Sequence, residues 1–121
     1  MSTSAWLAIA LLGGGMAVAR FAVDAVLSDH PAQPFPLGIL VVNLGGTLVL
    51  GLAAGAAVDG EAMAILAGGG TGSFTTFSTW MLDTERLAES GRRDLALLNA
   101  GLSLAAGLAA AFLGHWLASA L

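Results

Sequence analysis

Apolar residues dominate this chain, and its polar residues gather in three short segments that separate four long apolar stretches. Each stretch reaches roughly the 20 residues that an α-helix needs to cross a lipid bilayer. The four stretches lie at about residues 5–27, 38–58, 62–82 and 95–118. Little sequence remains outside them for a soluble domain. The pattern therefore predicts one all-α domain, residues 1–121, that crosses a membrane four times.

The composition supports a cell-membrane protein and argues against several other classes. Hydrophobic residues make up 57% of the 121 positions and charged residues only 10%, whereas a soluble domain carries about a quarter charged residues. The first stretch is too long for a cleaved signal peptide. The chain has no cysteine for thiolate sites and no basic run for nucleic acid. We find no nucleophile with a base and an orienting group, so we expect no enzyme.

Helix number and charge bear on orientation and assembly. Four crossings place both termini on one side of the membrane, and the opposite side carries Arg86, Arg92 and Arg93. The positive-inside rule then favours external termini, although the difference in positive charge between the two sides is only a few residues. Four helices do not easily enclose a pore, because each helix needs neighbours on most of its sides. We therefore expect an oligomer, most simply a dimer.

The third stretch contains the most informative segment. Glycine occupies most of residues 68–72, and four hydroxyls follow at Thr75, Thr76, Ser78 and Thr79. Such glycines are typical either of a tight helix crossing or of a helix that opens and frees carbonyl oxygens for a cation. Because lipid offers backbone groups no partners, an opened helix must face protein or a water-filled path. We expect this helix to be interrupted near its middle, where it would serve ions.

Two polar stripes accompany this segment. Asn43 and Thr47 lie four residues apart in the second stretch, and Asn99 and Ser103 have the same spacing in the fourth. This spacing places each pair on one helical face. The small residues that continue both stripes are typical of close helix packing. Polar groups at mid-membrane more often face a partner or a hydrated path, so the two stripes also indicate a polar lining.

Phe77 and Trp80 form an aromatic pair at helical spacing, three residues apart. The pair is typical of ordinary packing. It also fits an anion path, because the electropositive edge of an aromatic ring can meet an anion without a full positive charge. Conduction requires binding weak enough for release, which a lysine or arginine at this place would prevent.

Arg20 is a charged residue inside the first apolar stretch. It stands four residues before Asp24, near the end of the first stretch, so the two side chains can pair along the helix. A locally neutralised arginine that reaches toward the interface is one interpretation. The other is a vestibule residue that draws anions toward a path.

Together these segments resemble the CrcB/Fluc family of small fluoride channels over all four stretches. The most specific match is Gly-Ser-Phe-Thr-Thr-Phe-Ser-Thr at residues 72–79, which is similar to that family's GxxTTFST signature. Weaker matches are Gly13-Gly14 ahead of Arg20, the segment Val-Asn-Leu-Gly at residues 42–45, and Ser103 with Gly107.

The resemblance implies an antiparallel dimer with two fluoride paths and a structural Na⁺ at its centre. It assigns the backbone carbonyls of Gly72 and Thr75 to Na⁺. It assigns to the fluoride path Asn43, Phe77, Ser78, Thr79, Trp80 and Ser103. The partner would be a second copy of the chain or an oppositely oriented paralogue. Trp80 departs from the family's second phenylalanine, and Asn99 stands where an aromatic hydroxyl is common.

The function implied by the resemblance is passive export of cytoplasmic fluoride down its electrochemical gradient, which reduces fluoride toxicity. The alternative is a small proton-coupled multidrug or cation transporter, a class that shares the length and four-helix layout. Such transporters depend on a membrane-embedded carboxylate in their first helix. Here the first apolar stretch has no acid before Asp24, which favours the channel.

Overall fold

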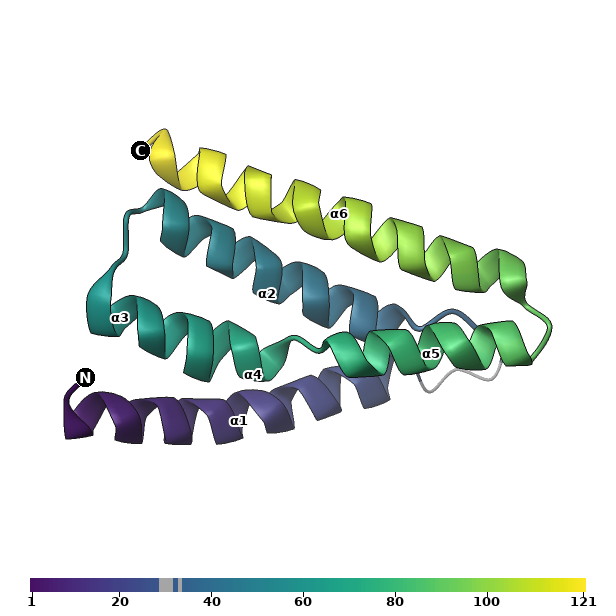
Figure 1. Cartoon of the computed structure of the whole chain (residues 1–121), viewed down its shortest axis with the longest axis horizontal. Coiled ribbons are helices and arrows are strands. Elements are labelled where there is room, and N and C mark those ends of the chain that lie inside the picture. The colour runs from purple at the N-terminus through teal and green to yellow at the C-terminus, as the bar shows by residue number, and fades with distance from the viewer. Residues whose placement is uncertain (29–31, 33) are drawn as a thin grey trace.

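The computed structural model describes residues 1–28, 32 and 34–121, and these residues contain helices but no strand. The elements are α1 (Thr3–Ser28), α2 (Leu37–Gly55), α3 (Gly60–Ala64), the π-helix η1 (Ile65–Thr71), α4 (Gly72–Phe74), α5 (Phe77–Glu89) and α6 (Arg93–Ser119). The prediction of an all-α chain is confirmed. In Figure 1 the series from α3 to α5 forms one rod beside α1, α2 and α6, and both termini lie at the same end.

Among the described residues, three helices are long and apolar enough to cross a membrane, namely α1, α2 and α6. They match three of the predicted stretches, although α2 ends at Gly55 instead of continuing to residue 58. The chain turns there because Ala57 adopts a positive φ of 53°. The Val58 N–H then donates to the Ala53 carbonyl at 3.0 Å, which closes the helix end. The remaining predicted stretch, 62–82, is divided among the elements from α3 to α5.

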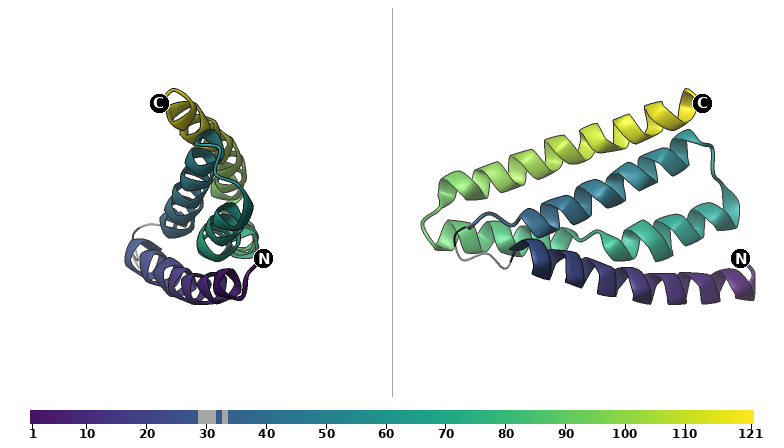
Figure 2. Two further views of the ribbon diagram at one scale, coloured as in Figure 1. Left: turned by 90° about the vertical axis from the view of Figure 1, so that its left-hand side faces the viewer. Right: turned by 180° about the vertical axis from the view of Figure 1, so that it is seen from behind.

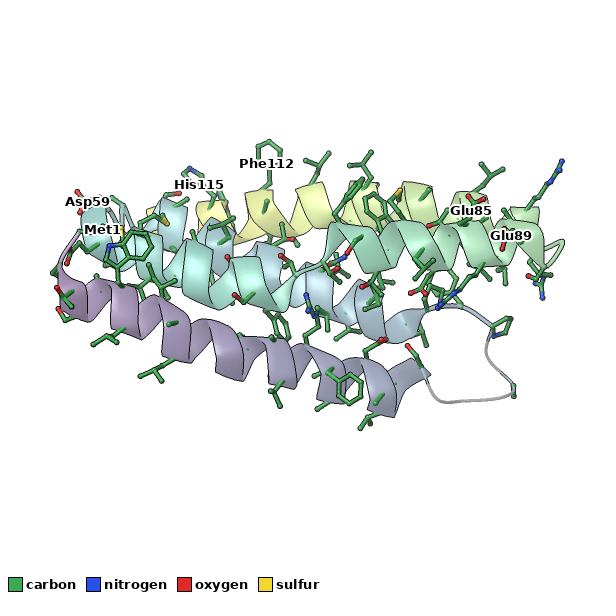
Figure 3. The ribbon with its side chains drawn as sticks, turned by 60° about the horizontal axis from the view of Figure 1, so that its bottom comes forward. Met1, Asp59, Glu85, Glu89, Phe112 and His115 are labelled. Carbon is green, nitrogen blue, oxygen red and sulfur yellow. The ribbon has the colours of Figure 1, made fainter. Side chains whose placement is uncertain are left out.

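Large apolar side chains cover the outside of the helices instead of filling a core. Leu11, Phe21 and Phe112 are all more than 70% exposed, and Figure 3 shows Phe112 pointing away from the bundle. Asp59 lies near the Met1 end, and Glu85 lies toward the opposite end. Apolar flanks with charged ends are the arrangement that a bilayer requires of a helical protein.

Close backbone contact joins α2 to α6, which lie side by side in Figures 1 and 2. A Cβ atom added at Gly51 would collide with the carbonyl oxygen of Ala111, and one added at Gly114 would collide with that of Leu48. Only residues without a side chain fit at these two positions. Of the two interpretations of the small-residue stripes, close packing therefore holds for Gly51 and Gly114.

The glycine run has two structural roles. An added Cβ at Gly69 would lie 2.9 Å from the Cα of Ile9, so this glycine lets α1 approach η1. An added Cβ at Gly72 would lie 2.6 Å from the carbonyl oxygen of Ala67, across the wide turn of the π-helix. π-Helical turns occur frequently at functional sites. Here η1 is followed by α4 and then by the non-helical residues Thr75 and Thr76.

Candidate functional site

The backbone leaves helical geometry at Thr75 and Thr76, which we call the break. Thr75 has φ −76° and ψ 159°, and Thr76 has φ −149° and ψ 124°. Figure 1 shows the ribbon extended here between α4 and α5. The Thr76 hydroxyl accepts the N–H of Thr79 at 3.2 Å and so caps the start of α5. A threonine at this position therefore both ends one helical segment and begins the next.

Asn43 of α2 holds the break with both ends of its side-chain amide. Its Nδ2 donates to the carbonyl of Thr76 at 3.0 Å, and its Oδ1 accepts the N–H of Thr76 at 2.8 Å. This pair of bonds satisfies both backbone groups of an extended residue that lipid could not satisfy. A carboxamide nitrogen carries two hydrogens, so one N–H of Asn43 is not needed for this clamp.

The Asn43 clamp changes the hydrogen bonding of the carbonyl groups around the break. In a continuous α-helix the Gly72 carbonyl would accept the N–H of Thr76, but Asn43 takes that N–H. The Thr75 carbonyl would likewise accept the N–H of Thr79, which instead goes to the Thr76 hydroxyl. The carbonyls of Gly72 and Thr75 thus lose their regular helical partners. They are the two that the resemblance assigns to Na⁺.

Arg20 reaches the break from α1. Its Nη1 donates to the Thr75 carbonyl at 3.3 Å. Its expected partner Asp24 instead accepts a hydrogen bond from Ser28 at 2.8 Å, and Ser28 accepts the N–H of Gly38 at 3.1 Å. The salt bridges between described residues do not include an Arg20–Asp24 pair. That expected pairing is wrong, because Asp24 turns toward the start of α2.

The two aromatic rings at the start of α5 meet edge to face. The ring centroids of Phe77 and Trp80 are 5.5 Å apart and the rings are inclined by 83°. Phe77 is 69% exposed, whereas Trp80 is half-buried. The indole Nε1 of Trp80 donates to the Asn99 carbonyl of α6 at 3.1 Å. The indole N–H is therefore committed within the chain, and Phe77 presents the open ring.

An open groove of about 430 Å³ lies between α2, η1, α4, α5 and α6. Its lining includes most of the predicted site residues, namely Asn43, Gly72, Thr75, Phe77, Trp80 and Ser103. Ser78, Thr79 and Arg20 are not part of this lining. The described residues that line the groove are uncharged. The groove thus combines amide, hydroxyl and aromatic groups without a lysine or arginine that would trap an anion.

Several predicted hydroxyl groups already have partners in the chain. The hydroxyl of Ser103 donates to Asn99 Oδ1 at 3.4 Å. Ser78 and Thr79 lie 3.3 and 3.1 Å from the Thr76 hydroxyl. Around the groove these side chains form a network in which each hydroxyl is oriented by a neighbour.

The sequence places Thr76 and Asn99 only in general polar segments, without individual roles, and does not single out Thr84. Thr76 carries the backbone groups that Asn43 clamps, and its hydroxyl caps α5. Thr84 and Asn99 hydrogen-bond to each other at 2.9 Å. The signals were present: Thr76 lies inside the most specific motif, Asn99 lies in a polar stripe, and Thr84 follows Trp80 by one helical turn.

Comparison with known proteins places the chain in a family. The family model described as "CrcB-like protein, Camphor Resistance (CrcB)" matches residues 7–115. The fluoride-specific ion channel FluC 2 of Mycolicibacterium paratuberculosis is 48% identical over 118 residues, covering 97% of this chain and 96% of that protein. FluC 2 of Mycobacterium tuberculosis is 45% identical, covering 98% and 94%.

A more distant relative extends the similarity beyond these bacteria. FluC 1 of Symbiobacterium thermophilum, also named a fluoride-specific ion channel, is 41% identical and covers 90% of this chain and 93% of its own length. The residues that the family model matches, 7–115, include part or all of every helix and the whole segment around the break. With its apolar helices, the chain is a multi-pass membrane protein and a member of the CrcB family.

Proposed function

We propose that this chain forms a fluoride channel through which cytoplasmic fluoride leaves the cell passively. The observation that carries the proposal is the uncharged groove, where Asn43, the threonine hydroxyls and the exposed Phe77 ring meet beside a helix break. Relatives of 41–48% identity are named fluoride-specific ion channels, which supports the same function.

The chemistry of the groove suits a small, strongly hydrated anion. The amide N–H of Asn43 that the clamp does not use can replace water around fluoride, as can hydroxyl groups that rotate away from their present acceptors. The edge of the Phe77 ring adds modest electrostatic attraction. Binding by such uncharged groups is weak enough for the ion to leave again. Fluoride that enters a cell as the neutral acid dissociates inside, and the channel lets the trapped anion out. The chain acts as a channel and not as an enzyme.

We also propose that the series from α3 to α5 makes one interrupted membrane crossing and that two chains pair antiparallel. The groove is open on one side, and the Phe77 ring is 69% exposed within its lining. A partner chain would close that side. The partner is a second copy or an oppositely oriented paralogue, and either would place two breaks near one axis.

Efflux from liposomes tests the proposed function. Purified protein is reconstituted in vesicles loaded with fluoride or chloride, and a potassium diffusion potential drives anion efflux. We expect rapid fluoride efflux and little chloride efflux, each measured with an ion-selective electrode. Fluoride efflux no faster than from protein-free vesicles would refute the channel, and equal efflux of both anions would refute its selectivity.

The alternative function, a small proton-coupled multidrug or cation transporter, has no support in the structure. Its chemistry needs a carboxylate that is free to exchange protons inside the membrane. In α1 the acidic side chain is Asp24, near the end of the helix, where its carboxylate accepts a hydrogen bond from Ser28 at 2.8 Å. That arrangement serves the junction between α1 and α2.

We propose a structural Na⁺ held by the backbone carbonyls of Gly72 and Thr75. The donor set fits this ion, because hard cations take oxygen ligands and both carbonyls lose their regular helical partners at the break. The Thr75 carbonyl also accepts Arg20 at 3.3 Å, but a carbonyl oxygen has two lone pairs. Two carbonyls from each of two antiparallel chains would supply four ligands.

Removing Na⁺ should lower fluoride efflux, whereas Thr75→Ala should leave the Na⁺ dependence nearly unchanged. The substitution keeps the backbone carbonyl and removes only a hydroxyl that donates to the Thr71 carbonyl at 2.8 Å. Efflux is measured against Na⁺ concentration, with N-methylglucamine as the replacement cation. A large shift in the half-maximal Na⁺ concentration for Thr75→Ala would show that the hydroxyl, not the carbonyl, is the ligand.

A further inference from the structure

A partly buried hydrogen-bond relay joins α5 to α6 at Trp80, which lines the groove. Asn99 of α6 is 1% exposed, and its Nδ2 donates to the hydroxyl oxygen of Thr84 at 2.9 Å. The Thr84 hydroxyl in turn donates to the Trp80 carbonyl at 2.8 Å. The described buried side chains have no unsatisfied nitrogen or oxygen. Each polar group of the relay is therefore accounted for.

The relay holds Trp80 at two separate points. Its backbone carbonyl is bonded through Thr84 to the Asn99 side chain. Its indole N–H is bonded to the Asn99 backbone carbonyl at 3.1 Å. Two anchors on one residue of α6 restrict both the rotation of α5 about its axis and the tilt of the indole ring. A fully satisfied buried network of this kind makes one packing arrangement distinct from its alternatives.

The fixed indole then determines where the Phe77 ring lies. Phe77 has few contacts of its own, since 69% of it is exposed, and its edge-to-face contact with Trp80 has a centroid distance of 5.5 Å. Such a contact is directional, because the positive edge of one ring meets the negative face of the other. Within the chain, the Trp80 ring is therefore the contact that sets the orientation of Phe77.

We propose that Thr84 and Asn99 are positioning residues that orient the Phe77 ring in the groove by fixing the indole of Trp80. This inference rests on the proposed function, because it gives the oriented ring its purpose. Trp80 then contributes to the path through its ring and not through its N–H, which is already donated to Asn99. Thr84 and Asn99 do not line the groove themselves, and Thr84 acts on it through Trp80.

Thr84→Val tests the relay with little change of shape. Valine has nearly the volume of threonine but can neither donate to the Trp80 carbonyl nor accept from Asn99. We expect roughly fivefold slower fluoride efflux, the factor for losing the one hydrogen bond that joins the two helices, at average strength. The other lost bond, to the Trp80 carbonyl, lies within α5. Thr84→Ser keeps the hydroxyl and should restore efflux to near the wild-type rate. Equal rates for the valine, serine and wild-type proteins would overturn the proposal.

The fluorescence of Trp80 reports ring position independently of conduction. Trp6 and Trp116 are 60% and 64% exposed, so both can be replaced by phenylalanine to leave Trp80 as the single tryptophan. In this background Thr84→Val should lower the emission anisotropy of Trp80, and Thr84→Ser should not. Slower efflux with unchanged anisotropy would show that Thr84 acts by some route other than the ring, and would also overturn the proposal.

A double substitution checks that both residues act through one relay. If they do, Asn99→Leu combined with Thr84→Val slows efflux no more than Asn99→Leu alone, because the shared bond is already lost. If the double variant instead slows efflux by the product of the two single factors, the two residues do not act through one relay. If the wild-type protein itself fails to conduct fluoride, the proposed function falls, whereas the anisotropy measurement still decides whether the relay holds Trp80.

Discussion

Asn43→Leu is expected to abolish fluoride efflux, with the largest effect of any single change in this chain. Leucine cannot accept the Thr76 N–H or donate to the Thr76 carbonyl, both of which the Asn43 amide now pairs within 3.0 Å. Each buried group left without a partner costs about 1–3 kcal/mol. The break would then lose its extended geometry, and the groove would lose an amide donor. Efflux from liposomes and the melting temperature in detergent both measure the result.

Asn43→Asp removes the amide donor of Asn43 and keeps an oxygen that can accept the Thr76 N–H. An aspartate oxygen can still accept the Thr76 N–H, but it cannot donate to the Thr76 carbonyl, so we expect an intermediate loss of stability and a severe loss of efflux. Ser73→Ala is the matched control, because the Ser73 hydroxyl bonds at 3.3 Å to the Gly68 carbonyl of its own helical turn. Wild-type efflux from Asn43→Leu would contradict a role for Asn43 in the path or in the break.

Phe77→Ile should reduce fluoride efflux by at least tenfold while leaving the fold and assembly intact. The ring is 69% exposed, so little packing is lost when it is replaced by another apolar side chain of similar bulk. What disappears is the electropositive aromatic edge beside the groove. The same purified protein is assayed for efflux and for oligomeric state by size exclusion with light scattering.

Phe21→Ile provides the control for Phe77→Ile. Phe21 is 75% exposed on α1 and does not line the groove, so its replacement changes hydrophobic surface in the same way. Efflux at the wild-type rate is expected for this control. Similar losses for both variants would indicate a general effect of exposed phenylalanines on membrane insertion, and an undiminished rate for Phe77→Ile would rule out an aromatic path.

The family and the helical class could be predicted from the sequence because their signals are local. The string at residues 72–79 is contiguous, and the family comparison confirms the resemblance that it indicates. The capping role of Thr76 is local too, since a hydroxyl three residues before Thr79 can accept its N–H within one helical turn. The sequence nevertheless predicts the end of α2 at residue 58, whereas the helix ends at Gly55, because the turn at Ala57 carries no glycine or proline to mark it.

The partners of polar side chains could not be predicted in the same way. The sequence allows Arg20 to pair with Asp24 on its own helix, yet Arg20 donates to the Thr75 carbonyl, 55 residues away. Asn43 bonds to Thr76 across 33 residues. An amide or a guanidinium group can form hydrogen bonds with many different partners. The choice among them depends on how the helices are rotated and packed against one another.

A helical protein that lies in a membrane can be predicted from this sequence alone, because bilayer thickness and the lack of water inside it leave apolar segments of this length few alternatives. The motif at residues 72–79 also indicates the family. In contrast, the clamp of the Asn43 amide on Thr76 and the bond from Trp80 to Asn99 depend on the packing of the helices. Those contacts join residues distant in sequence, and they form only where helix packing brings a donor within reach of its acceptor.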